Sequence, residues 1–299
     1  AVRDPWGFRP LSVGKLPHGG GHVAASEYGA LRTLGCEACR EVKPGEIIAL
    51  SSNALKVFQP FTSQPQPSLC TFEHIYFSRP DNTWGGRNVH HVRQQLGANL
   101  AKESPVDADV VIPIPDSSIP AAIGYATASG ISFNDGFIKN RYIGRTFIEP
   151  TDSLRKQGVA LKYNVILENV LNKRVIMIDD SIVRGNTTGP LLQLLKTAGA
   201  KEVHVRITCP PIKYPCYMGV DMGSRDELIA AKHSIEKIRD MVGANSLSYL
   251  SLESMMDAIG AQDGYCNACF TGRYPLSIPD GVNKNGFEIP LEYQQGANA

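Results

Sequence analysis

The sequence of 299 residues holds 30 Lys and Arg against 29 Asp and Glu, which gives a formal net charge of +1. That balance supplies no overall field to attract nucleic acid or a membrane surface, so any anion site must be local. The hydrophobic fraction of 42% is ordinary for a globular protein. No apolar run is long enough to cross a bilayer, and the first residues do not resemble a secretion signal. We therefore expect a cytoplasmic protein of roughly two domains, with no nucleic-acid or membrane partner.

The first 60 residues differ from the rest of the chain in their pattern of apolar and turn-forming residues. Two short strand-like stretches, residues 22–26 and 46–50, are separated by Gly and Pro turns. Residues 60–69 (PFTSQPQPSL) are rich in Pro, Gln and Ser and have no periodicity, which is typical of a linker. We place a domain boundary there, with residues 1–69 in a first unit and residues 70–299 in a second.

Beyond the linker, strand-like and helix-like segments alternate. Helices are expected at 88–103, 119–129 and 189–200, and strands at 109–116, 133–140, 174–180 and 202–210. This alternation predicts an α/β fold with a parallel, doubly wound sheet. Ligands of such sheets bind beyond the carboxyl ends of the strands, which is where the unusual residues of this sequence fall.

The strand over 174–180 ends in two adjacent carboxylates and continues into a loop of small and hydroxyl-bearing residues. The polar members of this VIMIDDSIVRGNTTG segment are Asp179, Asp180, Ser181, Arg184, Gly185, Asn186, Thr187 and Thr188. Backbone N–H groups of such a loop, at a helix N-terminus, bind phosphate, while paired carboxylates bind vicinal hydroxyls directly or through Mg²⁺. The pattern indicates a sugar-phosphate site. The competing interpretation is a strand that ends in solvated acids and an ordinary turn.

Two further stretches carry polar residues whose role chemistry alone does not decide. IPIPDSS places Asp116, Ser117 and Ser118 after a strand, either as a second anion loop or as a plain turn before a helix. Residues 139–162 hold six cations, among them Arg145 and Lys162. Such a run suits either a solvated loop or a mobile lid that neutralises a phosphorylated substrate and excludes water.

Seven cysteines in a chain without a secretion signal argue against a disulfide framework and favour reduced thiols or metal ligation. Cys36 with Cys39, and Cys266 with Cys269, form two C-x-x-C pairs. From spacing alone, two such pairs suggest a tetrahedral zinc site with four thiolate ligands.

Taken together, the motifs resemble those of the type I phosphoribosyltransferases, and among these the glutamine phosphoribosyl-diphosphate (PRPP) amidotransferases. The shared blocks follow one order along nearly the whole chain. They are YFSRPD (76–81), VIPIPDSS (111–118), KNRYIGRTFIEP (139–150), IDDSIVRGNTT (178–188), GAKEVHVR (199–206), PPIKYPC (210–216) and CFTGRYP (269–275). Several independent blocks are far more specific than the acid-and-phosphate loop alone.

The resemblance implies an enzyme that opens purine biosynthesis by displacing pyrophosphate from PRPP with ammonia derived from glutamine, forming 5-phosphoribosylamine. It implies that the loop over 179–188 binds PRPP, and that Asp116, Ser117 and Ser118 hold its pyrophosphate side. Ser118, Asp179 and Asp180 would lie at the Mg²⁺ site, and Arg145 and Lys162 would belong to a catalytic lid. The family also suggests a homo-oligomer under feedback control by purine nucleotides.

For the cysteines, the resemblance points away from zinc. In cluster-bearing members of the family four cysteines hold a [4Fe–4S] cluster, and these match Cys70, Cys216, Cys266 and Cys269. A structural role is implied, because the cluster would tie distant segments together. Cys36 and Cys39 match no ligand position and are expected to be structural thiols, and Cys209 is expected in the core.

The segments VRDPWGFRPLSVGK (2–15) and ASEYGALRTLG (25–35) resemble the last part of the family's glutaminase domain. The catalytic Cys of that domain is the first residue of the mature chain, whereas residue 1 here is Ala. We therefore expect a fragment with a partial N-terminal-nucleophile glutaminase domain that does not hydrolyse glutamine. Three alternatives stay open: a nucleobase salvage phosphoribosyltransferase, a non-catalytic PRPP-sensing protein and a zinc-stabilised binding module.

Overall fold

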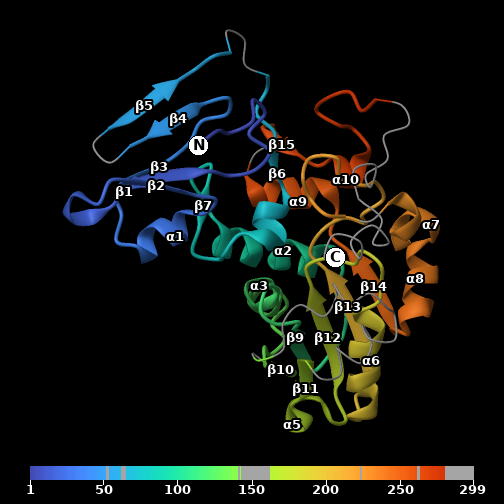
Figure 1. Ribbon diagram of the computed structural model, residues 1–299. Helices are drawn as coiled ribbons and strands as arrows, with labels where there is room; N and C mark the ends of the chain where they lie inside the picture. Colours follow the sequence, from blue (N-terminus) through green and yellow to red (C-terminus); the bar gives the residue numbers. More distant parts are fainter. Residues whose placement is uncertain are drawn as a thin grey trace, which may run out of the picture.

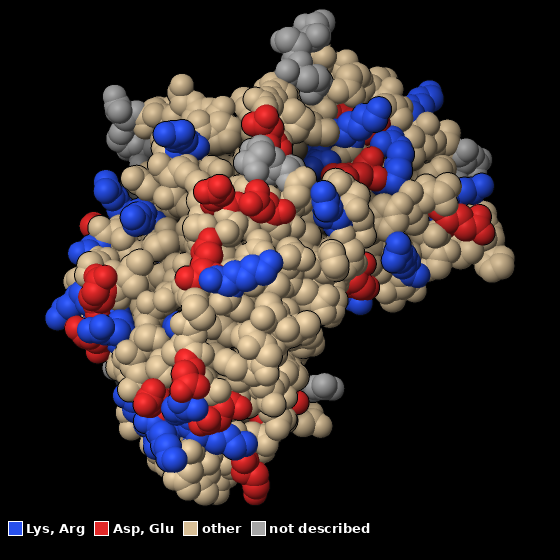
Figure 2. Space-filling view, turned by 180° about the vertical axis from the view of Figure 1, so that it is seen from behind, with Lys and Arg blue, Asp and Glu red and all other residues tan. Residues whose placement is uncertain are grey.

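The computed structural model describes residues 1–51, 54–61, 65–140, 142, 162–222, 224–260 and 263–279. Short antiparallel strands form an N-terminal part, which adjoins an α/β part through the region around helix α2 (Figure 1). Within these residues, no helix combines the length and the apolar character needed to cross a membrane. On the face drawn in Figure 2, basic and acidic side chains are interspersed, with neither sign gathered into one patch.

Five short strands build the N-terminal part, in one three-stranded and one two-stranded antiparallel sheet. They are β1 (Ser12–Lys15), β2 (His22–Ala25), β3 (Glu37–Glu41), β4 (Ile47–Leu50) and β5 (Leu55–Phe58), with the 3₁₀ turn η1 (Pro17–Gly19) and helix α1 (Tyr28–Thr33) between them. A small apolar core of Val13, Val42 and Ile48 lies beneath these strands. The strands predicted near residues 22 and 46 are confirmed as β2 and β4.

Four parallel strands form the central sheet, in the spatial order β14–β13–β12–β9. Their bounds are β9 (Val110–Pro113), β12 (Arg174–Asp179), β13 (Glu202–Ile207) and β14 (Ser246–Tyr249). β12 is buried from Val175 to Asp179, as expected for a central parallel strand that helices cover on both faces. The predicted α/β fold with a parallel sheet is therefore confirmed.

Helices flank this sheet on both sides (Figure 1). The helices of the α/β part are α2 (Val89–Glu103), α3 (Ile119–Ser129), α5 (Leu167–Val170), α6 (Thr188–Thr197), α7 (Ile229–Lys232), α8 (Ile235–Val242), α9 (Leu252–Ile259) and α10 (Ala268–Thr271). A π-helical turn, η2 (Glu73–Phe77), precedes α2, and a 3₁₀ turn, η4 (Arg225–Glu227), precedes α7. The helices predicted at 88–103, 119–129 and 189–200 are confirmed as α2, α3 and α6.

Three pairs of short strands complete the fold. They are β6 (Leu69–Cys70) with β15 (Tyr265–Cys266), β7 (Thr83–Trp84) with β8 (Arg87–Asn88), and β10 (Phe137–Lys139) with β11 (Tyr163–Val165). The β6–β15 pair joins the end of the predicted linker to a segment almost 200 residues later. The same stretch contacts the N-terminal part, because the Cys70 N–H donates to the carbonyl of Phe8 at 3.0 Å.

The pair α2 and α3 packs backbone against backbone on one side of the sheet. Asn88 caps α2 by accepting a hydrogen bond from the His91 N–H at 3.1 Å. A Cβ atom at Gly97 would lie 1.8 Å from the carbonyl oxygen of Ala121, and one at Gly124 would lie 1.9 Å from that of Gln94. Only glycine permits this approach, so the two helices fix the position of the loop between β9 and α3.

Candidate functional site

Two loops meet at the carboxyl edge of the central sheet. β9 and β12 are neighbours in parallel register, with Pro113 opposite Ile178, so the residues that follow each strand emerge side by side. The Ser117 hydroxyl after β9 donates a hydrogen bond of 2.6 Å to Oδ2 of Asp180 after β12. The structure thus brings together two polar loops whose bonded residues lie 63 positions apart in the sequence.

The paired carboxylates are buried at this edge. Asp179 and Asp180 are 8% and 7% exposed. Burial, and for Asp179 also the neighbouring charge of Asp180, raises the pKa of both carboxyls. Asp180 is oriented by Ser117 and by Ser181, whose hydroxyl donates to Oδ1 at 2.7 Å. The raised pKa values mean that the surroundings do not fully compensate the negative charge of the two carboxylates. A divalent cation or a set of hydroxyl donors would stabilise that charge.

The loop after β9 carries the other predicted anion-binding residues. Ser118 is 1% exposed and directly precedes α3. Asp116 is exposed and forms an ion pair with Lys139 of β10 at 2.5 Å. Tyr163 of β11 packs nearby, and its hydroxyl donates to the carbonyl of Pro115 at 3.4 Å. Burial, followed by the charges of Asp179 and Asp116, raises the pKa of Tyr163, so its hydroxyl stays a hydrogen-bond donor.

The loop after β12 leads into α6. Gly185 has φ +79°, a left-handed conformation that favours glycine, and this lets the chain turn toward the helix. Thr187 occupies the N-cap position of α6 without capping it through its side chain, and Thr188 is buried. Arg184 pairs with Glu227 of η4 at 3.1 Å. Backbone N–H groups at this helix start remain the feature that suits a phosphate.

The predicted lid falls mostly outside the described residues. Arg145 lies outside them, as do residues 143–161 as a whole. Lys162 is described, and its Nζ lies 5.6 Å from the centroid of the Tyr163 ring. Tyr163 in turn contacts the loop after β9 through the carbonyl of Pro115.

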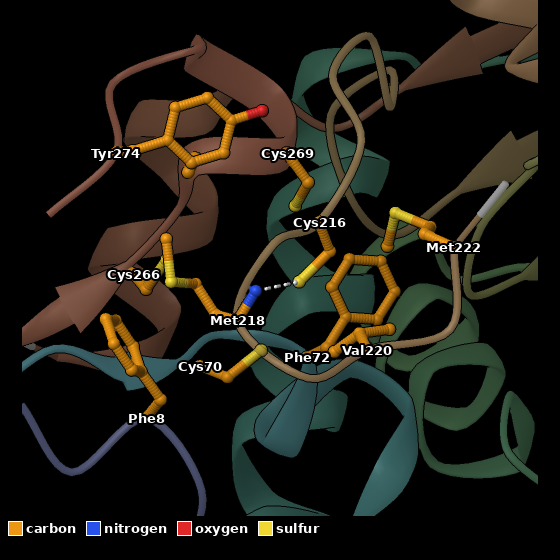
Figure 3. Close-up of a pocket in the computed structure, with 11 residues that line it drawn as sticks. Phe8, Cys70, Phe72, Cys216, Met218, Val220, Met222, Cys266, Cys269 and Tyr274 are labelled. Carbon is orange, nitrogen blue, oxygen red and sulfur yellow. Dashed lines mark hydrogen bonds between the residues drawn. The ribbon is translucent and has the colours of Figure 1, made fainter. Parts of the chain in front are cut away.

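Four cysteines line one small cavity, although they come from four segments (Figure 3). Cys70 lies on β6, Cys216 in the loop after β13, Cys266 on β15 and Cys269 on α10. The rest of the lining is apolar and aromatic, including Phe8, Phe72 and Tyr274. Burial raises the pKa of Cys70 to about 12 and also raises the pKa of Cys266 and Cys269. Without a cation these thiols would stay protonated.

The lining of this cavity decides which metal groups its residues could hold. In the described part of the chain, no three or more His, Cys, Asp or Glu side chains are spaced to hold one metal ion. Four soft sulfur ligands round an apolar cavity are nevertheless the set that iron–sulfur clusters use. The zinc site built from two C-x-x-C pairs is not supported, because Cys36 and Cys39 lie at β3 in the N-terminal part, away from this lining.

Comparison with known proteins identifies the family. No protein-family model matches the chain. The chain is 50% identical over 280 residues to the amidophosphoribosyltransferase of Archaeoglobus fulgidus. The aligned residues cover 93% of this chain and 61% of that protein. The amidophosphoribosyltransferase of Bacillus subtilis is 49% identical over 280 residues, 92% of this chain and 58% of that protein. The chain belongs to the amidophosphoribosyltransferase family.

Solved structures of the family share the fold along the same span. The glutamine PRPP amidotransferase of B. subtilis, complexed with ADP and GMP, matches with a TM-score of 0.84 at 48% identity, covering 94% of this chain and 62% of that chain. The present chain spans about three fifths of the length of the curated amidophosphoribosyltransferases that it matches.

Sequence patterns did not single out two buried residues, Arg93 and Tyr163. Arg93 of α2 is 2% exposed, and its charge lowers the pKa of Asp180 against the larger effect of burial. Tyr163 contacts the loop after β9 through its hydrogen bond to the carbonyl of Pro115. Tyr163 adjoins the predicted lid lysine, which could have drawn attention to it. Nothing in the sequence indicated that Arg93 would be buried, because a cation within a helical stretch ordinarily faces solvent.

Proposed function

We propose that this chain carries the PRPP-binding and transfer half of an amidophosphoribosyltransferase, the enzyme that opens purine biosynthesis. The observation that carries the proposal is the contact of two anion-binding loops at one sheet edge, where Ser117 orients Asp180. Identity of 50% to a named amidophosphoribosyltransferase over 93% of the chain supports the same reaction. We further propose a cytoplasmic location, since the free thiols suit a reducing compartment. A homo-oligomer is proposed only from the resemblance to the family.

In this proposal the substrate lies across the two loops. The 5'-phosphate at the start of α6 is bound by the backbone N–H groups of Arg184, Gly185, Asn186, Thr187 and Thr188 and by the two threonine hydroxyls. Asp179 and Asp180 accept hydrogen bonds from the ribose hydroxyls, with Ser117 and Ser181 holding Asp180 in place. The loop containing Asp116, Ser117 and Ser118 faces the pyrophosphate side.

The reaction is a displacement at the anomeric carbon. The lone pair of ammonia forms the new C–N bond while the C–O bond to pyrophosphate breaks, and the bonding electrons leave with the pyrophosphate. The nitrogen then loses a proton, giving 5-phosphoribosylamine. No protein nucleophile is needed, so catalysis consists of positioning and of stabilising the charge that grows on the leaving group. Lys162 and Arg145 supply that positive charge in our proposal, as part of the lid.

Two inorganic groups belong to the proposal. Mg²⁺, held near Ser118, Asp179 and Asp180, would neutralise phosphate oxygens and balance the buried carboxylates. A [4Fe–4S] cluster held by Cys70, Cys216, Cys266 and Cys269 would join β6, β15, α10 and the loop after β13. Its role would be structural, because its four ligands come from segments far apart in the chain.

Release of pyrophosphate tests the proposed reaction. We would measure it from PRPP and Mg²⁺, with and without ammonium at mildly alkaline pH, for the wild type and for Asp179→Asn. We expect release that depends on ammonium and falls by about 100-fold or more in the variant, since a substrate-binding carboxylate is lost. Adenine and guanine serve as competing acceptors in parallel reactions.

Each outcome separates the proposed function from its alternatives. Ammonium-dependent release supports an amidophosphoribosyltransferase. Release that depends on a nucleobase instead would contradict it in favour of a salvage phosphoribosyltransferase. PRPP binding without release by folded, iron-loaded protein would contradict catalysis by this chain alone and leave a PRPP-sensing protein.

A further inference from the structure

Cys36 and Cys39 are two thiols that neither the proposed substrate site nor the proposed cluster uses. They form a C-x-x-C pair around the start of β3, and both are free and half-buried. Among the residues that the structure describes, no third His, Cys, Asp or Glu side chain completes a metal-binding group with them. Two accessible thiols that lie side by side suit thiol–disulfide chemistry, in which one attacks and the other resolves.

A β-bulge in β3 separates the two cysteines. Val13 pairs with Arg40 and Lys15 pairs with Glu37, so β3 has one residue more than β1 between these pairs. Ala38 lies inside the bulge with φ +46°, a left-handed conformation that residues other than glycine seldom adopt. A bulge re-aims the side chains next to it. The two thiols therefore do not alternate between the faces of the sheet as they would in a regular strand.

Both cysteines contact strand β1 at Gly14. A Cβ atom on Gly14 would lie 2.9 Å from Cβ of Cys36 and 2.9 Å from Sγ of Cys39. Glycine thus leaves open the space in which the two side chains meet. The Cys39 thiol also donates to the carbonyl of Cys36 at 3.4 Å. A disulfide requires such a close approach of its two halves.

Helix α1 holds the backbone of the bulge. The hydroxyl of Tyr28 donates to the carbonyl of Cys39. The same helix is anchored on the α/β part, because the Gly29 N–H donates to Oδ1 of Asn82 at 2.8 Å. With its backbone fixed, Cys39 loses less conformational freedom on bonding to Cys36 than it would in an unfolded chain.

We propose that Cys36 and Cys39 form a reversible disulfide by exchange with a low-molecular-weight disulfide such as oxidised glutathione. The inference goes beyond the proposed function and does not rest on it, because the pair lies in the N-terminal part and not at the sheet edge that carries the paired acids.

The exchange has two steps. The Cys36 thiolate attacks one sulfur of the reagent, whose S–S bond breaks, and one thiolate leaves. The Cys39 thiolate then attacks the Cys36 sulfur of the mixed disulfide, and the second thiolate leaves. Two electrons pass to the reagent, and the two cysteine protons end on the released thiols. Cys39 takes the second step, because partial burial and the neighbouring Cys36 raise its pKa and its thiol bonds to the Cys36 carbonyl.

Peptide mapping of residues 33–40 tests the pair directly. Trypsin cleaves after Arg32 and Arg40, so both cysteines fall in one peptide. An internal disulfide removes two hydrogens from it and blocks alkylation. The full chain is equilibrated anaerobically in mixtures of reduced and oxidised glutathione, either folded or unfolded in urea, then quenched with acid and alkylated. We expect the equilibrium constant for the internal disulfide to be at least about tenfold larger in the folded chain than in urea.

Three variants serve as controls. Tyr28→Phe keeps the ring and removes the hydrogen bond to the Cys39 carbonyl, so we expect the constant of the folded chain to fall by about threefold or more, and that in urea to stay the same. Cys36→Ser and Cys39→Ser each keep one thiol and should show only the mixed disulfide with glutathione. Cys39→Ser should form it faster, because it keeps the attacking thiol.

A constant in the folded wild type no larger than that in urea would overturn the inference, because the spacing alone would then account for the bond. Glutathione retained on the peptide without an internal disulfide would also overturn it. Faster formation of the mixed disulfide in Cys36→Ser than in Cys39→Ser would overturn the assigned order of attack.

Discussion

The hydroxyl of Ser117 donates a 2.6 Å hydrogen bond to Asp180, a residue 63 positions further along the chain. The contact exists because β9 and β12 are parallel neighbours that end at the same sheet edge. It fixes one oxygen of a buried carboxylate while Ser181 fixes the other. The carboxylate is therefore oriented before any ligand arrives, which lowers the entropic cost of binding.

Removing this contact should weaken substrate binding without unfolding the protein. We expect Ser117→Ala to raise the KM for PRPP by about tenfold, because a hydrogen bond to a charged group contributes about 1.5 kcal/mol. Steady-state kinetics of ammonium-dependent pyrophosphate release would measure it. Ser129→Ala at the far end of α3 is the control, since that hydroxyl bonds only to its chain neighbours, the Ala126 carbonyl and the Ile131 N–H. An unchanged KM in Ser117→Ala would contradict the assigned role.

The four cysteines of the cavity should determine iron content. Substitution of Cys216 by Ser is expected to abolish the iron and sulfide retained after anaerobic reconstitution, because a thiolate ligand from a separate loop is lost. Cys36→Ser is the control and should retain the wild-type iron content, since Cys36 does not line the cavity. Stoichiometric zinc in place of iron, or full iron content in Cys216→Ser, would contradict the cluster assignment.

Stability should respond in opposite directions to the same substitution at two helical glycines. Gly97→Ala would place a methyl group 1.8 Å from the Ala121 carbonyl oxygen, so we expect a loss of about 3 kcal/mol in the free energy of unfolding. Gly189→Ala in α6 meets nothing closer than 4.0 Å, so we expect a gain of about 0.5 kcal/mol from helix propensity. Urea denaturation measures both. Equal effects would contradict the close packing of α2 against α3.

His74 should make the protein less stable in mild acid. Burial, with a smaller effect of Arg93, lowers the pKa of His74 from 6.5 to about 4. Between pH 6.5 and 4, His74 is protonated in the unfolded chain and neutral in the folded chain. The free energy of unfolding therefore falls as the pH drops from 6.5 toward 4. At pH 5 this contribution is about 2 kcal/mol relative to pH 8.

Urea denaturation of the wild type and of His74→Gln at both pH values isolates that contribution. Other titrating groups, including the buried aspartates, are common to the two proteins, so they cancel in the difference. We expect the wild type to lose about 2 kcal/mol more than His74→Gln on acidification. The same loss in both proteins would show that His74 takes up its proton in the folded state.

Local patterns in the sequence predicted the elements that carry the acids. The apolar run before Asp179 is typical of a buried strand, and the spacing over 88–103 is typical of a helix. The contact of Ser117 with Asp180 required the order of strands in the sheet, which spacing along the chain does not encode. Arg93 was missed for a related reason, because its burial depends on the turn 74–78 packing over α2.

The cysteines show what the spacing of residues predicted and what only the resemblance to a family predicted. Spacing favoured a zinc site that combined two C-x-x-C pairs, whereas the structure brings Cys266 and Cys269 beside Cys70 and Cys216. Cys70 and Cys216 stand alone in the sequence, so only the resemblance to a family could select them. The strand and helices over 225–259 were not predicted individually, although Ser234 and Ser251 cap two of them by accepting backbone hydrogen bonds.

The most direct test of the account is a calorimetric titration of the folded chain with PRPP, with and without Mg²⁺, beside the double variant Asp179→Asn, Asp180→Asn. Burial raises the pKa of both acids, so the neutral variant should fold and melt no lower than the wild type. We predict saturable, Mg²⁺-dependent binding of one PRPP per chain by the wild type and none by the variant. Equal binding by the two proteins, or no binding by the wild type, would contradict a PRPP site at this edge of the sheet.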